Sequence, residues 1–503
     1  MKTPSRLLIV LALAVCALSA RADISLPAIF SEHMVLQRDA VVPVWGTADA
    51  GTVITVEFAG QKKSATAAPD GRWRVDLDPL TASAAPRDLI VSSHRASKIE
   101  NRKFSDVLVG EVWLGSGQSN MAMTVNRAKD FEAEKSTAHF PLIRHFKEES
   151  PNAVAPQSAS KGRWVLCSPE SVGTFSAALY FFGRELHQTL GVPVGLINSS
   201  VGGTPIEAWI DADAQKSSKE IQAALAALPP TPPTATAALP PPPAAPKAGA
   251  AEKQKSAAKK TTKASKATAP RSTTGGLFNG KISPLIPYAI RGALWYQGEA
   301  NTTPSKAPLY EHQFALLIRD WRTRWGHEFP FAWVQLPNFI GTGRDWPTVR
   351  EAMLKTLALP QTGMAITIDV GEANDIHPKD KQTVGHRLAQ WALGSVYAQK
   401  VAATSGPLPA GHEIRGHEII LRFRHVEGGL VARGGPLTGF VVAGADRKWA
   451  PAQARLVDNT LVVSAPDVPA PLAARYAWEN FPTCNLYNGA GLPASPFRTD
   501  VWK

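Results

Sequence analysis

The spacing of apolar and polar positions divides the chain into three parts. Before about residue 105, short runs such as VITVEF (53–58) and WRVDL (73–77) alternate apolar and polar residues, and turn signals such as Pro69-Asp70-Gly71 separate them. Such alternation is typical of half-buried strands. We therefore expect residues 23–105 to form a small all-β domain that resembles a sandwich.

From Val107 the pattern changes to longer apolar runs that alternate with helical stretches such as SAALYFFGRELHQTL (176–190), where His187 is interpreted as packed or solvated. This alternation predicts an α/β domain over residues 106–405, with a parallel sheet covered on both faces. Strand-like runs return in EIILRF (418–423) and TLVVS (460–464). Residues 406–503 are therefore predicted to form a second, C-terminal β region.

Residues 216–274 interrupt the α/β pattern. The segment consists mostly of Pro, Ala, Lys and Thr, and it has no aromatic residue to bury. A sequence of this kind cannot recover its ordering entropy by forming a core. We interpret it as a disordered insertion in a surface loop.

The first 22 residues have the pattern of a secretory signal peptide. Lys2 and Arg6 precede an apolar run (7–18), and Ala20-Arg21-Ala22 has the small-x-small form of a cleavage site. Val15 before Cys16 argues against a lipoprotein signal. No later stretch has the roughly 20 apolar residues of a membrane span. We expect an exported protein, secreted or periplasmic, without a membrane span.

The net charge of +12 is concentrated outside the predicted folded parts. Eight Lys or Arg residues and one Glu lie between residues 231 and 271, and three more basic residues lie in the predicted signal peptide. The charge therefore does not indicate a nucleic-acid-binding face. Cys167 and Cys484 permit at most one disulfide and lack metal-ligand spacing, so no metal site is expected.

Polar clusters follow five predicted strands of the α/β domain. In open parallel sheets, ligands bind outside the carboxyl ends of the strands, so these clusters should meet at one edge. The strands and their clusters are 112–114 with GSGQSN, 194–197 with NSSVGGT, 290–296 with QGEAN, 331–334 with QLPN, and 364–368 with DVGEANDIHP.

These clusters contain the residue types of a serine hydrolase. Ser119, Asp375 and His377 can supply a nucleophile, an orienting carboxylate and a base, and the Gly-rich and amide-bearing loops can stabilise an oxyanion. Taken alone, Ser119 could instead cap the following helix. Trp295 and Tyr296 could stack on a sugar or belong to the core.

Four ordered blocks, GQSNM, NSSVGGTPIEAW, WYQGEAN and DIHPKDKQTVGHRLA, resemble the sialate O-acetylesterases of the SGNH hydrolase superfamily. The resemblance extends to the flanking LQRDAVVPVWGTADAGTVITVEFAG and AWENFPTCNLYNGAGLPASPF. It implies a flavodoxin-like three-layer α/β/α domain, a serine esterase mechanism without a cofactor or metal, and acetylated sugars as substrates.

The resemblance also implies roles for single residues. Ser119 corresponds to the nucleophile, and its own N–H is one oxyanion donor. The second donor is placed on Gly203, with Gly202 as the alternative. The third, an Asn side chain in the wider superfamily, corresponds to Gln297 or Asn301. Glu299, and Asn301 if it is not a donor, are expected to bind the sugar or fix the loops.

His377 is the expected base. Pro378 and the apolar pattern after it predict that a helix begins there, so that the helix dipole would keep the imidazole neutral. Asp375 lies two residues before His377, whereas the superfamily places its Asp three residues before. A backbone carbonyl could therefore orient the ring instead, and Asp369 and Glu372 are the other nearby carboxylates.

These observations predict a carbohydrate O-acetylesterase, with O-acetylated sialic acids as the expected substrates. An acetylxylan or other polysaccharide deacetylase is an alternative that uses the same residues. A carbohydrate-binding protein with a vestigial esterase site is an alternative of another class.

Overall fold

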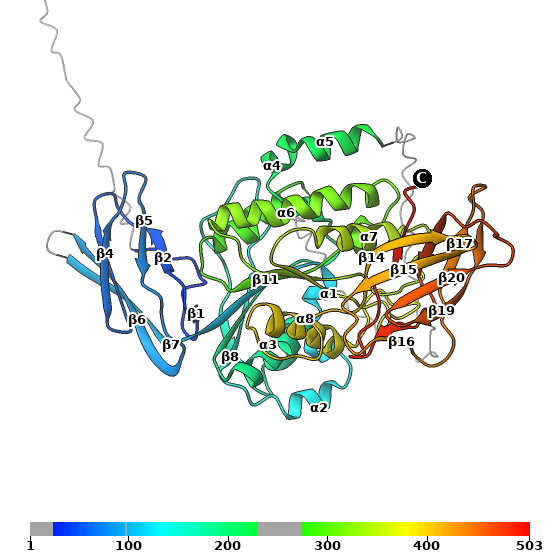
Figure 1. Cartoon of the computed structure of the whole chain (residues 1–503). Helices are drawn as coiled ribbons and strands as arrows, with labels where there is room; N and C mark the ends of the chain where they lie inside the picture. The colour runs from blue at the N-terminus through cyan, green and yellow to red at the C-terminus, as the bar shows by residue number, and fades with distance from the viewer. Residues whose placement is uncertain (1–23, 96–97, 229–272, 503) are drawn as a thin grey trace, which may run out of the picture.

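A computed structural model of the chain describes residues 24–95, 98–228 and 273–502 (Figure 1). The predicted signal peptide lies outside these residues. The ribbon shows an N-terminal β domain, a central α/β domain and a C-terminal β region in a row, with the α/β domain between the other two.

The N-terminal domain is built from short strands with alternating burial, as the sequence pattern predicts. In β5, for example, exposed and buried residues alternate along the whole strand. β2 pairs with β5, while β3 pairs with β4 and β6, and β6 pairs with β7. The strands are β1 (Val35–Gln37), β2 (Val42–Thr47), β3 (Val53–Phe58), β4 (Gln61–Thr66), β5 (Arg72–Leu77) and β6 (Ser83–Arg95).

Strand β7 (Lys98–Gly117) joins the first two domains. Its first half pairs with β6, whereas residues 111–117 pair with the central strands β10 and β11. The predicted domain boundary between residues 105 and 106 therefore lies inside one continuous strand.

The central sheet has the order β13-β12-β11-β7-β10-β8-β9. All neighbours are parallel except β8 and β9. The chain runs from β7 to β8 and β10 on one side and then crosses to β11, β12 and β13 on the other. The remaining strands are β8 (Ile143–Lys147), β9 (Trp164–Leu166), β10 (Val194–Ser200), β11 (Gly292–Tyr296), β12 (Phe331–Val334) and β13 (Thr362–Ala365).

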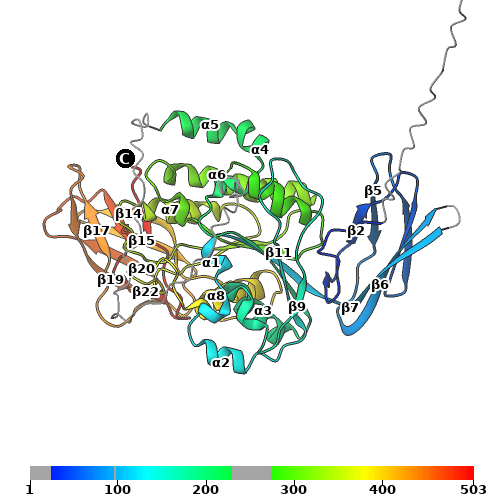
Figure 2. The ribbon, with the colours of Figure 1, turned by 180° about the vertical axis from the view of Figure 1, so that it is seen from behind.

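Helices cover both faces of this sheet, and the two figures show them as separate layers (Figures 1 and 2). One apolar cluster joins the sheet to α3 and α8, and another joins it to α6 and α7. Trp295 and Tyr296 are fully buried core residues. The helices are α1 (Ser119–Ala122), α2 (Phe131–Ser136), α3 (Ala177–Leu190), α4 (Ala212–Ser217), α5 (Lys219–Ala226), α6 (Tyr310–Trp325), α7 (Trp346–Thr356) and α8 (Lys381–Ser395).

Shorter helical turns lie mostly at the loops that surround the sheet. The 3₁₀ turns are Val125–Arg127, Val172–Thr174, Ile206–Ala208, Ser283–Leu285, Glu299–Asn301 and Ala307–Leu309, and a π-helical turn covers Phe278–Ile282.

Helix α5 corrects the predicted start of the insertion. The sequence analysis begins the disordered segment at residue 216, yet residues 219–226 form a helix that packs on α6 and buries Ile221. Ser218 caps this helix by accepting a hydrogen bond from the backbone N–H of Ile221. The segment from residue 229 to 272 lies outside the described residues.

The C-terminal region contains small antiparallel sheets with a core of their own. Its strands are β14 (Leu408–Arg415), β15 (Glu418–Arg424), β16 (Leu430–Ala432), β17 (Phe440–Ala443), β18 (Trp449–Pro451), β19 (Gln453–Val457), β20 (Thr460–Ser464), β21 (Ala473–Tyr476), β22 (Leu486–Asn488) and β23 (Phe497–Arg498).

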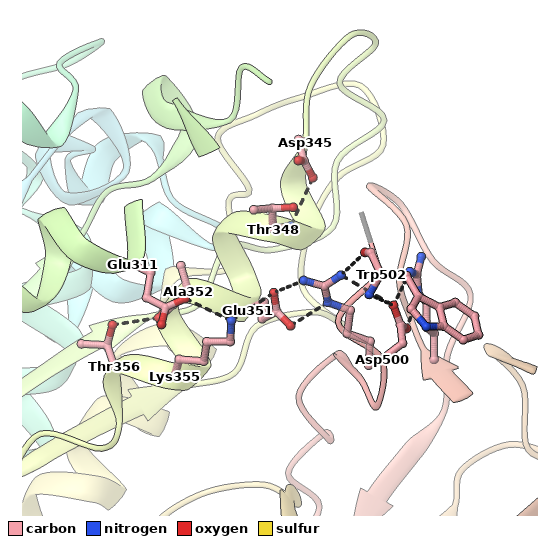
Figure 3. A network of polar contacts seen from close by, with 11 residues as sticks. Glu311, Asp345, Thr348, Glu351, Ala352, Lys355, Thr356, Asp500 and Trp502 are labelled. Carbon is pink, nitrogen blue, oxygen red and sulfur yellow. Dashed lines mark hydrogen bonds and ion pairs between the residues drawn. The ribbon is translucent and has the colours of Figure 1, made fainter. Parts of the chain in front are cut away.

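Polar contacts fix the C-terminal region to helix α7. Figure 3 shows Glu351 of α7 between Lys355 and the final segment, which carries Asp500 and Trp502. Arg498 binds both carboxylate oxygens of Glu351, at 2.8 and 2.9 Å. Such a bidentate pair fixes the relative orientation of the two elements.

The fully buried Arg350 makes a second connection between α7 and the C-terminal region. Its guanidinium donates to the carbonyls of Leu336 and Pro337, which follow β12, and to those of Glu479 and Asn480. The C-terminal region therefore stabilises a loop at the carboxyl edge of the central sheet.

Candidate active site

The ends of three neighbouring strands form the floor of the site. The N–H of Gln118 donates to the carbonyl of Tyr296, and that of Val201 donates to the carbonyl of Gly117, each at 3.0 Å. Gly117 has φ of +134°, and a Cβ there would lie 2.2 Å from the Tyr296 carbonyl oxygen. Only glycine fits this turn. It presents Ser119 between β10 and β11, where the winding of the sheet reverses.

Ser119 faces His377 across the sheet edge. The Oγ atom of Ser119 lies 2.8 Å from Nε2 of His377. Ser119 is the first residue of α1, and the capping position belongs to Gln118, whose side chain makes no cap hydrogen bond. The serine therefore does not act as the helix cap. Both side chains are partly exposed, so a substrate can reach them.

The electrostatic environment keeps His377 neutral. Partial burial lowers the pKa of His377, and the positive charges of Lys381 and Arg127 act in the same direction, while Asp375 opposes them. A neutral imidazole can accept a proton from the serine hydroxyl.

The predicted position of His377 at a helix N-terminus is wrong. Helix α8 begins at Lys381, and Asp380 caps it by accepting a hydrogen bond from the N–H of Thr383. This cap outweighs the preference of Pro378 for the first helical position. Burial and neighbouring charges, and not a helix dipole, account for the neutral ring.

Asp375 is the carboxylate nearest to Nδ1 of His377. Its Oδ1 atom lies 3.5 Å from Nδ1 and accepts a 2.9 Å hydrogen bond from the backbone N–H of His377. Asp369 is paired with Arg387, and Glu372 accepts from the N–H of Lys379. Within the described residues no other carboxylate pairs with the imidazole. The contact with Asp375 is long and half exposed.

Backbone N–H groups at the site can donate hydrogen bonds to the negative charge that develops on the substrate oxygen. The backbone N–H groups of Ser119, Gly202 and Gly203 have no acceptor within the part of the chain that the structure describes. Gly202 lies against the serine, because a Cβ built on it would be 3.5 Å from the Cβ of Ser119. Gly203, at φ +73°, faces open space. The structure therefore places Gly202, the alternative donor, directly beside the nucleophile.

The expected third oxyanion donor is not available at Gln297. Its Nε2 donates to the oxygens of Asn301, Thr204 and Gln118, at 2.8, 3.2 and 3.2 Å, and its side chain is fully buried. The alternative, Asn301, donates to Glu207 and is equally buried. Both amides point inward, where the carbonyl of Thr204 and the partly buried carboxylate of Glu207 accept from them. They support the loops, and neither amide is exposed to a substrate.

Glu299 is also an interior residue, so its expected role in sugar binding is wrong. The same correction applies to Asn301, which is fully buried. Only 3% of Glu299 is exposed, and Oε1 accepts a 2.5 Å hydrogen bond from Nδ2 of Asn120. Burial raises the pKa of Glu299. Its Oε2 atom is buried without a hydrogen-bond partner in the described structure.

Sequence reasoning missed two residues beneath the site, Asn120 and Lys381. Asn120 follows the nucleophile in GQSNM, and Lys381 lies four residues after His377, at the start of α8. Both are fully buried, and Nζ of Lys381 donates to Oδ1 of Asn120 at 2.7 Å. The sequence signal that could have identified them is their position inside the motifs GQSNM and DIHPKDKQTVGHRLA. A polar residue that is buried at such a position needs a hydrogen-bond partner.

Other potential functional groups have structural surroundings. Within the described ranges, no three His, Cys, Asp or Glu side chains are grouped so that they could hold a metal ion. In the same ranges, no helix combines the length and apolarity required to cross a bilayer. Cys167 and Cys484 are free thiols. His187 lies in the last turn of α3, where its ring contacts the carbonyl of Val192.

Comparison with known proteins places this geometry in a class. Residues 109–230 and 280–402 match the family described as "Carbohydrate esterase, sialic acid-specific acetylesterase". A carbohydrate acetylesterase from Xanthomonas citri has a similar structure, with a TM-score of 0.80, 34% identity and coverage of 95% of this chain and 100% of that one. The protein is therefore a carboxylic ester hydrolase.

Curated relatives make the family specific. The human protein named sialate O-acetylesterase is 30% identical, and the similar region covers 93% of this chain and 91% of the human one. The rat protein of that name is 29% identical, with 93% of both chains covered. The chain belongs to the sialate O-acetylesterase family.

Proposed function

We propose that this protein is a serine esterase that removes acetyl groups from the hydroxyls of sialic acids through an acetyl-enzyme intermediate. The observation that carries the proposal is the 2.8 Å contact between Oγ of Ser119 and Nε2 of His377 at a solvent-accessible strand end. The names of the human and rat relatives support the sialate as substrate.

In the proposed reaction, Oγ of Ser119 attacks the acetyl carbonyl carbon while His377 takes the hydroxyl proton. The tetrahedral oxyanion is bound by the N–H of Ser119 and an N–H of the Gly202–Gly203 turn. His377 then donates the proton to the leaving sugar oxygen, and the C–O bond of the ester breaks. Water attacks the acetyl-enzyme with His377 again as base, which releases acetate and regenerates the serine.

Asp375 is proposed to favour the imidazolium form and the correct ring orientation. The 3.5 Å separation and the bond from the His377 backbone to the same oxygen support a modest contribution. No cofactor takes part in any of these steps.

We assign the central domain to the flavodoxin-like SGNH arrangement of three layers. Support comes from the parallel strands β13, β12, β11, β7, β10 and β8 and from the helices on both sheet faces. We also propose that the protein is exported after cleavage behind Ala22, and the N-terminal sequence of the mature protein tests this, because it should begin at Asp23.

The substrate is tested by measuring acetate release from an O-acetylated sialic acid, from acetylated xylan oligosaccharides and from 4-nitrophenyl acetate. We expect kcat/KM to be highest for the sialate, with Ser119→Ala inactive on all three. The carbohydrate acetylesterase name of the Xanthomonas citri relative favours one alternative, another acetylated sugar. Faster release from xylan would identify that alternative, and a folded wild-type protein that releases no acetate would be a binding protein.

A further inference from the structure

A cluster of buried polar side chains lies directly beneath the Ser119–His377 pair. Asn120, Lys381 and Glu299 are 0%, 0% and 3% exposed. They come from helix α1, helix α8 and the loop after β11, and none of them can touch a substrate. A protein buries a Lys and a Glu only at a considerable cost in solvation.

Asn120 connects the nucleophile's helix to the loop that carries the base. Its Nδ2 group donates to the carbonyl of Ile376 at 3.0 Å and to Glu299 at 2.5 Å, and its Oδ1 accepts from Lys381. Both N–H groups and one oxygen lone pair are therefore used. Ile376 immediately precedes His377.

Lys381 holds the other side of the same loop. Its Nζ atom donates to the carbonyl of Pro378, which immediately follows His377, at 2.7 Å. The ammonium also lies over the ring of Tyr296, 5.1 Å from its centroid. Lys381 begins helix α8, where the helix dipole disfavours a positive charge. A cation in this position needs another explanation than helix stability.

We propose that Asn120, Lys381 and Glu299 form a positioning unit, which sets His377 against Ser119 by binding the carbonyl oxygens on both sides of the histidine. Glu299 orients Asn120 and offsets the charge of Lys381. The Asn next to the nucleophile thus fixes the distance from the nucleophile to the base. The inference rests on the proposed function, because it assumes that this pair performs the reaction.

The same unit places a positive charge near the imidazole. Lys381 is one of the groups that lower the pKa of His377, together with burial and Arg127, while Asp375 raises it. Glu372, Asp375 and Asp380 also face Lys381, in addition to Glu299. Burial lowers the pKa of Lys381 to about 7, so the lysine is charged at the mildly acidic pH where histidine titrates.

The test compares Lys381→Met with Lys381→Gln, using 4-nitrophenyl acetate. The Met variant lacks the donor and the charge, and we expect kcat to fall about 10²-fold, as for a base misplaced by about 1 Å, with KM nearly unchanged. The Gln variant retains a donor, so it should recover about tenfold of the lost kcat. Because both lack the charge, both should move the acid limb of the kcat/KM profile upward by about one pH unit.

Lys281→Met is the matched control. Lys281 is 7% exposed and its Nζ also donates to a backbone carbonyl, that of Glu148, at 2.8 Å. The control should lose thermal stability as the Lys381 variants do, yet keep the wild-type kcat and acid limb. Equal kcat values in Lys381→Met and Lys281→Met, or an acid limb that stays in place in both Lys381 variants, would overturn the proposal.

Asn120→Ala provides a second measurement that does not depend on the Lys381 variants. It should lower kcat to a similar extent, and Asn120→Ala combined with Lys381→Met should fall little below the worse single variant, since both remove the same constraint. Independent, multiplicative losses would refute a single unit. Ser119→Ala separates the two proposals: activity in that variant contradicts the proposed function, whereas an inactive Ser119→Ala beside fully active Asn120 and Lys381 variants contradicts this inference alone.

Discussion

Glu111 and Glu299 are both buried carboxylates of the central domain. They lie at opposite ends of its parallel strands, Glu111 at the amino end and Glu299 at the carboxyl end. Glu111 lies where β7 enters the central sheet, and its two oxygens meet donors from four side chains. Glu299 lies after β11 and has one side-chain donor, Asn120. The donors to Glu111 are Gln37, Arg38, Arg291 and Tyr397.

The different surroundings have opposite effects on the two acids. Burial alone would raise the pKa of Glu111, but the bonds from Arg291 and Arg38 outweigh it and lower the pKa. At Glu299 burial prevails and the pKa is raised. The partners of Glu111 compensate its buried charge, whereas Oε2 of Glu299 is buried without a hydrogen-bond partner in the described structure, a situation that is common at functional sites. The comparison therefore distinguishes the amino end of the strands, where the buried carboxylate is structural, from the carboxyl end, where the catalytic site lies.

The largest effect is expected from Ser119→Ala, at the carboxyl end of the strands. Loss of the nucleophile should lower kcat by about 10⁵-fold, as the removal of a triad serine does, while the melting temperature stays near that of the wild type. Initial rates with 4-nitrophenyl acetate and a thermal unfolding curve measure both quantities. Activity above about a tenth of the wild-type level would contradict the assignment of the nucleophile.

Glu111→Gln should show the reverse behaviour. Removing one partner of a buried ion pair leaves Arg38 and Arg291 uncompensated, so the free energy of unfolding should fall by about 3 kcal/mol, while kcat changes little. Because the pKa of Glu111 is lowered, its stabilisation is present above the unfolded-state pKa and is lost as the pH falls through the folded-state value. Urea unfolding at pH 7 and at a series of pH values below about 4.5 tests this. A loss in the variant that stays the same throughout this series would be inconsistent with it.

Asp375→Asn tests a third, half-exposed carboxylate that belongs to neither type. Its 3.5 Å contact with Nδ1 should stabilise the imidazolium only moderately, so kcat should fall about 10²-fold, less than for a short buried contact. Steady-state kinetics with the acetyl ester gives the answer. A loss near 10⁴-fold would show that the contact shortens when substrate binds, and a kcat within fivefold of wild type would leave Ser119 and His377 as a dyad.

Glu299→Gln is expected to change stability by only about 1 kcal/mol at pH 7, because Gln can still accept the bond from Asn120. The folded-state pKa of Glu299 is raised, so its contribution is complete below the unfolded-state pKa and is lost as the pH rises through the folded-state value. Because Gln does not titrate, the variant does not lose stability in this way as the pH rises. Its stability relative to the wild type should therefore increase from pH 5 to pH 8, and calorimetric scans across that range would expose the opposite trend.

Arg127→Ala should give the smallest effect. The pKa of His377 is lowered, so the acid limb of kcat/KM should lie below the ordinary histidine value of about 6.5. Removing the exposed positive charge of Arg127 should raise the limb by about 0.3 pH unit at low salt, and high salt should erase the difference. A pH profile at two salt concentrations measures it, and Lys129→Ala, an exposed lysine of the same loop, serves as the control.

Much of the fold and the reacting pair could be predicted from the sequence. Strand ends and motif blocks pointed to Ser119 and His377, which the structure brings to 2.8 Å although 257 residues separate them in the chain. The resemblance to the sialate O-acetylesterases is confirmed by the family match. Local patterns suffice here because parallel strands of one sheet end at one edge.

The direction in which a polar side chain points could not be predicted. Gln297 and Asn301 have the amides that an oxyanion requires, but Gln297 donates to the buried carbonyl of Thr204 and Asn301 to the partly buried carboxylate of Glu207, so both point inward. The partners of Asn120 lie 179, 256 and 261 residues away in the sequence, so only the folded chain reveals them. The start of α8 depended on the competition between Pro378 and the Asp380 cap, which propensity alone does not settle.

Strand β7 gives the N-terminal domain a limited modularity. The strand begins in the hairpin of that domain and ends two residues before the nucleophile, and β1 lies parallel to its middle, with Val35 opposite Leu108 and Gln37 opposite Gly110. A recombination junction at residue 105 would assemble one strand from two parents and separate β1 from its partner. The unit that can be exchanged between family members as a whole is therefore the N-terminal domain together with the esterase sheet.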